Sequence, residues 1–185
     1  KADEIRYLFG GDLLRQGIAT SMGVEALQIP MFGLYGACST SGEALALAGM
    51  CAAAGYGKYM LAVTSSHFGS AEKEFRFPLG YANQRPLSAH WTVTGSGAFL
   101  VRAAEPAAAL VSEPAEDDIS TTHVSHVRIA GVTVGKIVDY GLKDSQNMGA
   151  CMAPAAMDTI VQNFEDFGRS EQDYDRIITG ERKRI

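Results

Sequence analysis

The residue best suited to chemistry in this sequence is Cys38, which lies where a predicted strand meets a predicted helix. An apolar stretch at residues 31–35 predicts a short buried strand, and an Ala-rich stretch at residues 39–54 predicts a helix. Small neighbours, Gly36 and Ala37, leave room for a sharp turn. Because a helix N-terminus favours a thiolate, a cysteine here is suited to act as a nucleophile in acyl chemistry. A small buried cysteine with no chemical role fits the same spacing equally well.

A second candidate is His67, which follows a stretch at residues 59–64 whose β-branched and aromatic residues predict a buried strand. Ligands of open α/β sheets bind beyond the carboxyl ends of the strands, so His67 is a candidate acid or base. The alternative is a structural imidazole held by hydrogen bonds. His123 and His126 do not suggest a metal site, because residues three apart on a strand face opposite sides. No metal is therefore expected.

The elements that must position these residues alternate between strand and helix, which predicts an α/β fold around a central sheet. Further strands are predicted at residues 5–9, 124–138 and 176–179, with a turn at residues 10–12, and residues 91–102 are predicted to form a strand pair or one long bent strand. Helices are predicted at residues 13–27, 39–54 and from Pro154 to Gly168, followed by a capping turn at Ser170 and Asp173. Residues 70–88 and 103–120 are predicted to be long connections. The helix at residues 39–54, apolar on nearly every face, is expected to be the most buried, with other elements packed all round it.

The composition is that of a globular protein and lacks the features of several other classes. The 185 residues are 46% hydrophobic, and a net charge of -5 argues against a nucleic-acid surface. The three cysteines lie too far apart for a zinc or redox motif, which favours a reducing compartment. No apolar run approaches the roughly 20 residues of a membrane span. Because the chain starts without Met and both ends lie against predicted strands, we expect residues to be missing at each end.

Several short motifs together resemble one family. The turn around Cys38 is similar to the nucleophile turn of the thiolase and ketoacyl-synthase superfamily. Within that superfamily, the chain resembles the stage V sporulation protein AD family from about residue 5 to residue 180. The matching motifs are GDLL at 11–14, GACSTS at 36–41, TSSH at 64–67, EFRFP at 74–78, TVTGSGA at 92–98, DSQNMG at 144–149 and MAPAA at 152–156.

The resemblance implies a thiolase-like α/β fold with layers in the order α-β-α-β-α, of which the first half is largely present and the second half only begun. Residues 1–122 would form the N-terminal thiolase-like half, with its front missing. Residues 123–185 would form the connecting strands and the start of the C-terminal thiolase-like half. Thiolase relatives are commonly dimers, so the resemblance also implies a homodimer.

The same resemblance implies a sporulation protein that binds dipicolinic acid, for its uptake into the forespore and its release in germination. Such a protein would act with other proteins of its operon, including membrane proteins, from the cytoplasmic side of the forespore or spore inner membrane. No cofactor is implied, apart from calcium if dipicolinate binds as its calcium chelate. No nucleic-acid partner is expected.

For the ligand site, the candidates are Cys38 and Ser39 in the turn, and His67, which nothing in the sequence places against Cys38. Dipicolinate carries two carboxylates, which cationic side chains pair with and which guanidinium groups bind through two hydrogen bonds. We therefore expect at least one basic side chain of the predicted connection to contact the ligand. The candidates are Lys73, Arg76 and Arg85.

Catalysis is not expected on this resemblance. Acyl-transferring relatives place a catalytic histidine after the strand predicted at residues 176–179, where this sequence has Gly180 and Glu181. A nucleophile without such a partner is better interpreted as a residue of a binding pocket. The alternative function is an acyltransferase or thiolase-like enzyme that uses Cys38 as nucleophile, with His67 as its base. A purely structural subunit of a membrane complex ranks behind both.

Overall fold

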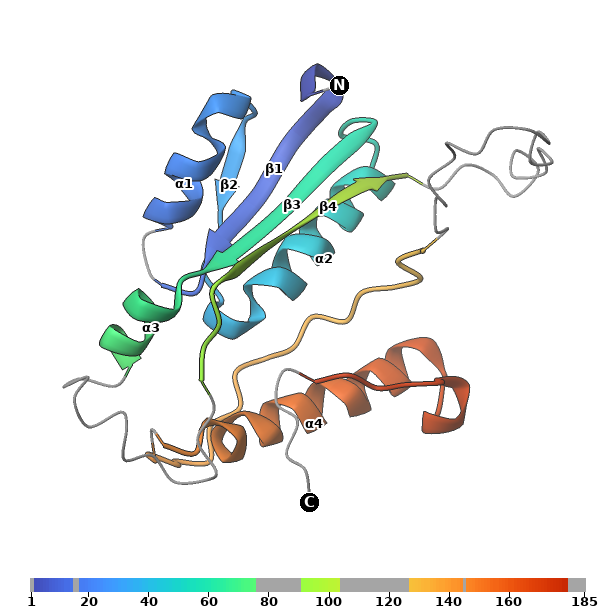
Figure 1. Cartoon of the computed structure of the whole chain (residues 1–185). Helices are drawn as coiled ribbons and strands as arrows, with labels where there is room; N and C mark the ends of the chain where they lie inside the picture. The colour runs from blue at the N-terminus through green and yellow to red at the C-terminus, as the bar shows by residue number, and fades with distance from the viewer. Residues whose placement is uncertain (1, 15–16, 76–90, 104–126, 145, 180–185) are drawn as a thin grey trace, which may run out of the picture.

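A mixed four-stranded sheet forms the centre of the described part of the computed structural model (Figure 1), which covers residues 2–14, 17–75, 91–103, 127–144 and 146–179. The strands are β1 (Ile5–Asp12), β2 (Met31–Gly33), β3 (Tyr59–Ser66) and β4 (Gly95–Arg102), in the spatial order β2-β1-β3-β4. β1 is parallel to both neighbours, whereas β4 is antiparallel to β3. The carboxyl ends of β1, β2 and β3 and the amino end of β4 therefore meet at one edge of the sheet.

The helices are α1 (Ile18–Val24), α2 (Thr40–Ala53), α3 (Phe68–Phe75) and α4 (Met148–Phe167), with short 3-10 turns at Ala2–Glu4, Glu25–Leu27, Ala37–Ser39 and Glu171–Asp173. This alternation confirms the predicted α/β class. None of the described helices combines the length and apolarity that a membrane crossing requires.

Helices α1 and α2 cover opposite faces of the sheet. Side chains of consecutive strand residues point to opposite faces, and two glycines at the end of β1 identify the two sides. A Cβ atom on Gly10 would contact Thr20 of α1, whereas a Cβ atom on Gly11 would meet Thr40 of α2. The described part of the sheet is thus the middle layer of a helix–sheet–helix arrangement.

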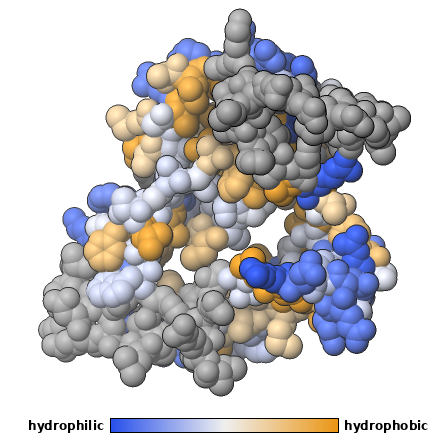
Figure 2. All heavy atoms as spheres, turned by 45° about the vertical axis from the view of Figure 1, so that its right-hand side comes forward, coloured by the Kyte–Doolittle hydropathy of each residue, from blue (hydrophilic) through white to orange (hydrophobic). Residues whose placement is uncertain are grey.

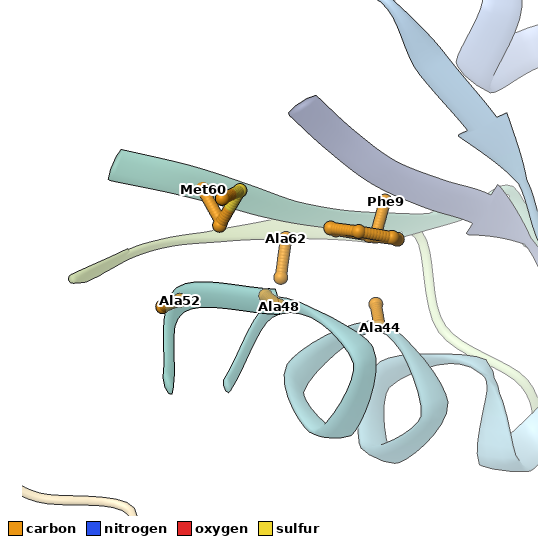
Figure 3. Packing of buried hydrophobic residues seen from close by; sticks show 6 residues of the cluster. All are labelled: Phe9, Ala44, Ala48, Ala52, Met60 and Ala62. Carbon is orange, nitrogen blue, oxygen red and sulfur yellow. The ribbon is translucent and has the colours of Figure 1, made fainter. Parts of the chain in front are cut away.

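The hydrophobic core lies between the sheet and α2 (Figure 3). Large side chains of β1 and β3 point down onto a row of alanines spaced four residues apart on the helix. Because residues at i and i+4 share one helix face, this row lets α2 approach the sheet closely. The cluster consists of Phe9, Met60, Ala62, Ala44, Ala48 and Ala52, each at most 2% exposed.

The predicted burial of α2 is only partly right. Its sheet-facing residues are buried, but Ser41, Gly42 and Glu43 are exposed and Met50 is 52% exposed. Within the described residues, α2 is therefore covered on the sheet side rather than packed all round. Figure 2 shows apolar residues in orange beside an opening between the part that holds the sheet and α4.

The predicted turn at residues 10–12 is wrong, because β1 continues to Asp12. Its last residues pair with β3, with Gly11 opposite Thr64 and Asp12 opposite Ser65. Glycine permits a turn but does not require one, and here the neighbouring strand supplies ladder hydrogen bonds up to the sheet edge. β2 is shorter than predicted and lies at the edge of the described sheet, which leaves Phe32 half exposed although it stacks on Phe9 with ring centroids 5.1 Å apart.

Three further predictions of strands and connections are corrected by the structure. Residues 127–138 and 176–179 form no strand, since neither segment pairs with a strand of the described sheet. Part of the predicted surface connection at residues 70–88 is helical, because α3 extends to Phe75. The remaining residues of that connection and of the one predicted at 103–120 lie almost wholly outside the described residues.

Helix α4 begins earlier than predicted. Asn147 caps it, accepting a hydrogen bond from the amide of Ala150 at 3.4 Å, and Pro154 lies inside the helix rather than in its first turn. The predicted end is confirmed: Gly168 adopts φ 59°, a left-handed conformation suited to glycine after a helix. The predicted capping turn between Ser170 and Asp173 is also present.

Candidate functional site

A cavity of about 600 Å³ opens at the sheet edge where the strand ends meet. The ends of β1 and β3, the turn before α2, the start of β4 and residues 91–93 line it. Its volume lies within the usual range of small-molecule sites, about 300–1,000 Å³. Its position fits the rule that open α/β sheets bind ligands beyond their strand ends.

Cys38 borders this cavity from the 3-10 turn Ala37–Ser39, directly before α2. The predicted strand-to-helix position is therefore confirmed, although the thiol is exposed rather than buried. Cys38 also lines a second cavity of about 290 Å³, together with Leu142 and with Cys151 of α4. The turn thus places the cysteine between two hollows, one toward β3 and β4 and one toward α4.

Hydrogen bonds within the turn hold Cys38 in place. The Thr40 hydroxyl donates to the carbonyl of Ala37 at 2.8 Å and accepts from the amide of Gly36 at 3.1 Å. The Ser39 hydroxyl donates to the Gly36 carbonyl at 2.8 Å. Ala37 adopts φ 48°, a left-handed conformation that costs a residue with a Cβ atom about 1–2 kcal/mol. The surrounding bonds maintain this strained geometry, which fixes the direction of the cysteine.

Asp12 is the one ionisable carboxylate among the residues that line the larger cavity, and it is 6% exposed. Its Oδ1 accepts from the amide of Leu14 at 3.0 Å, and its Oδ2 accepts from the amide and the hydroxyl of Thr20 at 3.3 and 3.2 Å. Because Thr20 lies in the first turn of α1, the carboxylate also faces the positive end of that helix. Asp12 therefore joins the floor of the cavity to α1.

The rest of the polar lining consists of hydroxyl groups. Seven side chains contribute them: Thr40, Ser41, Thr64, Ser65, Ser66, Thr92 and Ser96. Trp91 adds an aromatic surface, and its ring lies 5.4 Å from that of Phe68 at the start of α3. No Lys, Arg or His side chain of the described residues lines this cavity. Apart from Asp12, the described wall therefore offers neutral hydrogen-bonding groups and an aromatic ring.

The other predicted site residues lie elsewhere in the described part or outside it. His67 precedes α3 and is exposed; its Nδ1 lies 2.9 Å from the Ser70 hydroxyl and accepts from the Ser70 amide at 3.3 Å, as a helix cap would. His67 is not among the residues that line the cavity. Lys73 is exposed on α3. Arg76 and Arg85 lie outside the described residues, so their contact with a ligand stays a prediction.

Sequence reasoning missed most of the cavity wall. The sequence places Asp12 in a predicted turn, and it does not single out the hydroxyl groups in the last residues of β3 as site residues. Trp91 and Thr92 were assigned to a strand that in fact begins at Gly95. The motif TVTGSGA was the available signal, because it places hydroxyl groups and glycines at the start of β4. No group of His, Cys, Asp and Glu residues suited to a metal ion occurs in the described part of the chain.

Fold and site together define a class: an α/β protein with a cysteine at the start of a core helix, beside a hydroxyl-lined cavity at the sheet edge. The chain belongs to the stage V sporulation protein AD family, whose family model matches residues 1–185. It is similar to the stage V sporulation protein AD of Bacillus subtilis (strain 168), with 41% identity over 179 residues. That match covers 97% of this chain and 47% of the relative, so the chain spans about half of the relative's length.

Among solved structures, the chain is similar to the 3-oxoacyl-[acyl-carrier-protein] synthase III from Aquifex aeolicus VF5. The sequence identity is 18% and the TM-score is 0.38. The match covers 57% of this chain and 33% of the synthase.

Proposed function

We propose that this chain belongs to a non-catalytic sporulation protein that binds dipicolinic acid in the cavity beside Cys38. The chemistry of the cavity wall carries the proposal. Dipicolinate is a flat aromatic ring with two carboxylates: hydroxyl groups such as those of Ser65 and Ser96 donate hydrogen bonds to carboxylates, and Trp91 offers a face or an edge to the ring. Family membership supplies the link to sporulation.

The wider role that we propose is the uptake of dipicolinic acid into the forespore and its release in germination. The protein would act with membrane proteins of the same operon, at the cytoplasmic side of the forespore or spore inner membrane. Calcium would take part by binding to dipicolinate as its chelate. The bound calcium would also reduce the negative charge of the ligand, and no described cationic side chain lines the cavity to balance that charge. A fluorescent fusion that stays at the spore inner membrane after deletion of those membrane proteins would contradict the proposed partnership.

Calorimetry on the full-length protein tests binding directly. We expect saturable heat on titration with dipicolinate, measured with and without calcium, and a higher melting temperature with ligand, because a ligand that prefers the native state stabilises it. Trp91→Ala should weaken binding about tenfold, since an aromatic contact contributes roughly 0.5–1.5 kcal/mol beyond its buried area.

The matched control is Tyr56→Ala, which removes an aromatic ring that is 63% exposed and outside the cavity lining. It should leave the affinity unchanged. Isophthalate, which has the same two carboxylates without the ring nitrogen, tests whether the site recognises the chelating group. Absence of binding to both dipicolinate and its calcium chelate would exclude the proposal.

The second candidate function is an acyltransferase or thiolase-like enzyme. The observation that favours it is the position of Cys38 at the start of α2, beside a cavity of about 600 Å³. Incubation of the full-length protein with acetyl-CoA and acetoacetyl-CoA, followed by assay of CoA, separates the two functions. CoA release above background that disappears in Cys38→Ala would place the enzyme first; we expect no such release.

We also propose that two copies of the protein pair. The resemblance to dimeric thiolase relatives supports this, and so does β2, whose outer edge meets no other described strand. An exposed strand edge offers backbone groups for pairing with another chain. Phe32 on that strand is 51% exposed, which leaves an apolar ring beside the open edge.

A further inference from the structure

A buried carboxylate on α3 holds one wall of the cavity. Glu72 is 0% exposed, although glutamate is almost never fully buried unless its carboxylate is paired. Its Oε1 accepts two hydrogen bonds from Thr92, one from the backbone amide at 2.8 Å and one from the hydroxyl at 3.0 Å. Glu72 and Thr92 are 20 residues apart in the sequence, so this contact joins α3 to the segment that precedes β4.

The segment that Thr92 belongs to, residues 91–94, lies in no helix or strand. Trp91, Thr92 and Val93 all line the cavity. A segment without ladder hydrogen bonds depends on side-chain contacts for its position. Whatever fixes residues 91–94 therefore sets the shape of this wall.

Two further hydrogen bonds hold the same segment at the residues that follow Thr92. The Ser66 hydroxyl at the end of β3 donates to the carbonyl of Val93, and the amide of Phe68 donates to the Thr94 hydroxyl at 2.9 Å. Of the two residues that make these bonds, Ser66 is half-buried and Phe68 is exposed. Glu72 differs because its carboxylate is buried. Hydrogen bonds to such a group are stronger inside a protein than in water.

From these contacts we infer that Glu72 is a positioning residue: through Thr92 it sets the location of Trp91 and hence the shape and selectivity of the cavity. Glu72 touches no ligand in this role. The inference rests on the proposed binding function where ligand affinity is concerned, but its geometric part does not.

The test uses the full-length protein labelled with 5-fluorotryptophan, with the Trp91 fluorine resonance identified as the one missing from Trp91→Phe. In Glu72→Ala, we expect this resonance to shift toward its position in the unfolded protein and dipicolinate affinity to fall at least tenfold. Glu72→Gln should restore both within about threefold of wild type, because the amide oxygen still accepts both bonds from Thr92. Glu74→Ala, which removes an exposed carboxylate from the same helix, should change neither.

A second variant keeps the test decisive if Glu72→Ala does not fold. Thr92→Val keeps the shape of the side chain and removes one of the two donors, so it should give the same resonance shift in part and a three- to tenfold loss of affinity. An unchanged Trp91 resonance and unchanged affinity in Thr92→Val and in any folded Glu72→Ala would overturn the inference. If the wild type does not bind dipicolinate, the proposed function fails, and the Trp91 resonance alone still decides the role of Glu72.

Discussion

Gly11 illustrates how closely single residues are packed beneath the cavity. A Cβ atom at this position would overlap the carbonyl oxygen of Leu34 and lie 2.9 Å from the Thr40 methyl group. The backbone of the segment that leads to Cys38 therefore passes directly against β1. A glycine here allows the cysteine turn and the strand to lie side by side.

We expect Gly11→Ala to lower the free energy of unfolding by about 3 kcal/mol, the upper end for overpacking, because the obstructing atom belongs to the backbone and cannot rotate away. Gly23→Ala is the matched control, since a Cβ atom on Gly23 in α1 would meet no atom within 4 Å. That variant should gain about 0.5–1 kcal/mol through helix propensity. Urea denaturation measures the free energy of unfolding of both variants. If Gly11→Ala were as stable as Gly23→Ala, β1 would be able to move at Gly11 and make room for the added methyl group.

For single residues, residue type and the neighbouring sequence predicted the position of Cys38 well, but they identified few of the residues that line the cavity. Small residues before an Ala-rich stretch are enough to indicate a turn followed by a helix. The place of Asp12 depends on an interaction with Thr20 across eight residues, and that of Glu72 depends on one across 20. No local pattern encodes such pairings, so an acidic residue on a helix is easily taken for a solvated one.

Among the elements, α2 has the most specific packing. Ala44, Ala48 and Ala52 leave only methyl groups between the helix and the sheet, where Phe9 and Met60 fill the space. Densely packed interiors tolerate added volume poorly. The separation between helix and sheet is therefore set by the alanine row.

Ala48→Leu should lower the free energy of unfolding by about 1–3 kcal/mol, because the added carbons have no room against the sheet. Ala53→Leu adds the same atoms to the exposed end of the same helix and should change stability by less than about 0.5 kcal/mol. Thermal denaturation compares them. Similar melting temperatures for the two variants would mean that α2 does not control the core.

The same scale explains which elements were predicted and which were not. The strands β1 and β3 and the helix α2 have compositions that match their structures, so the sequence alone located them. The β-rich residues 127–138 carry the right side chains but have no described neighbour to pair with. Strand formation depends on a partner, and a partner is a property of the fold rather than of the segment.

For the whole molecule, the proposed pairing through β2 predicts a dimer, whose mass can be measured. Sedimentation of the full-length protein should give the mass of a dimer, and Phe32→Lys should shift it toward the monomer, because a charge opposes pairing at an apolar strand edge. Met22→Lys, at a residue of α1 that is 74% exposed, should leave the mass unchanged. A monomeric wild type, or a dimer that tolerates Phe32→Lys, would contradict the proposed interface.

The arrangement of strand ends described above also bears on how such a protein can diverge. The cavity residues from the sheet lie in the last residues of β1 and β3 and the first residues of β4, whereas the core between the sheet and α2 lies along the middle of the strands. Substitutions at the rim therefore leave most of the folding energy untouched, and ligand preference can drift between lineages while the scaffold persists. Asp12 is the exception, because it serves both the rim and the attachment of α1. Selection on stability and selection on binding would both act on that one carboxylate.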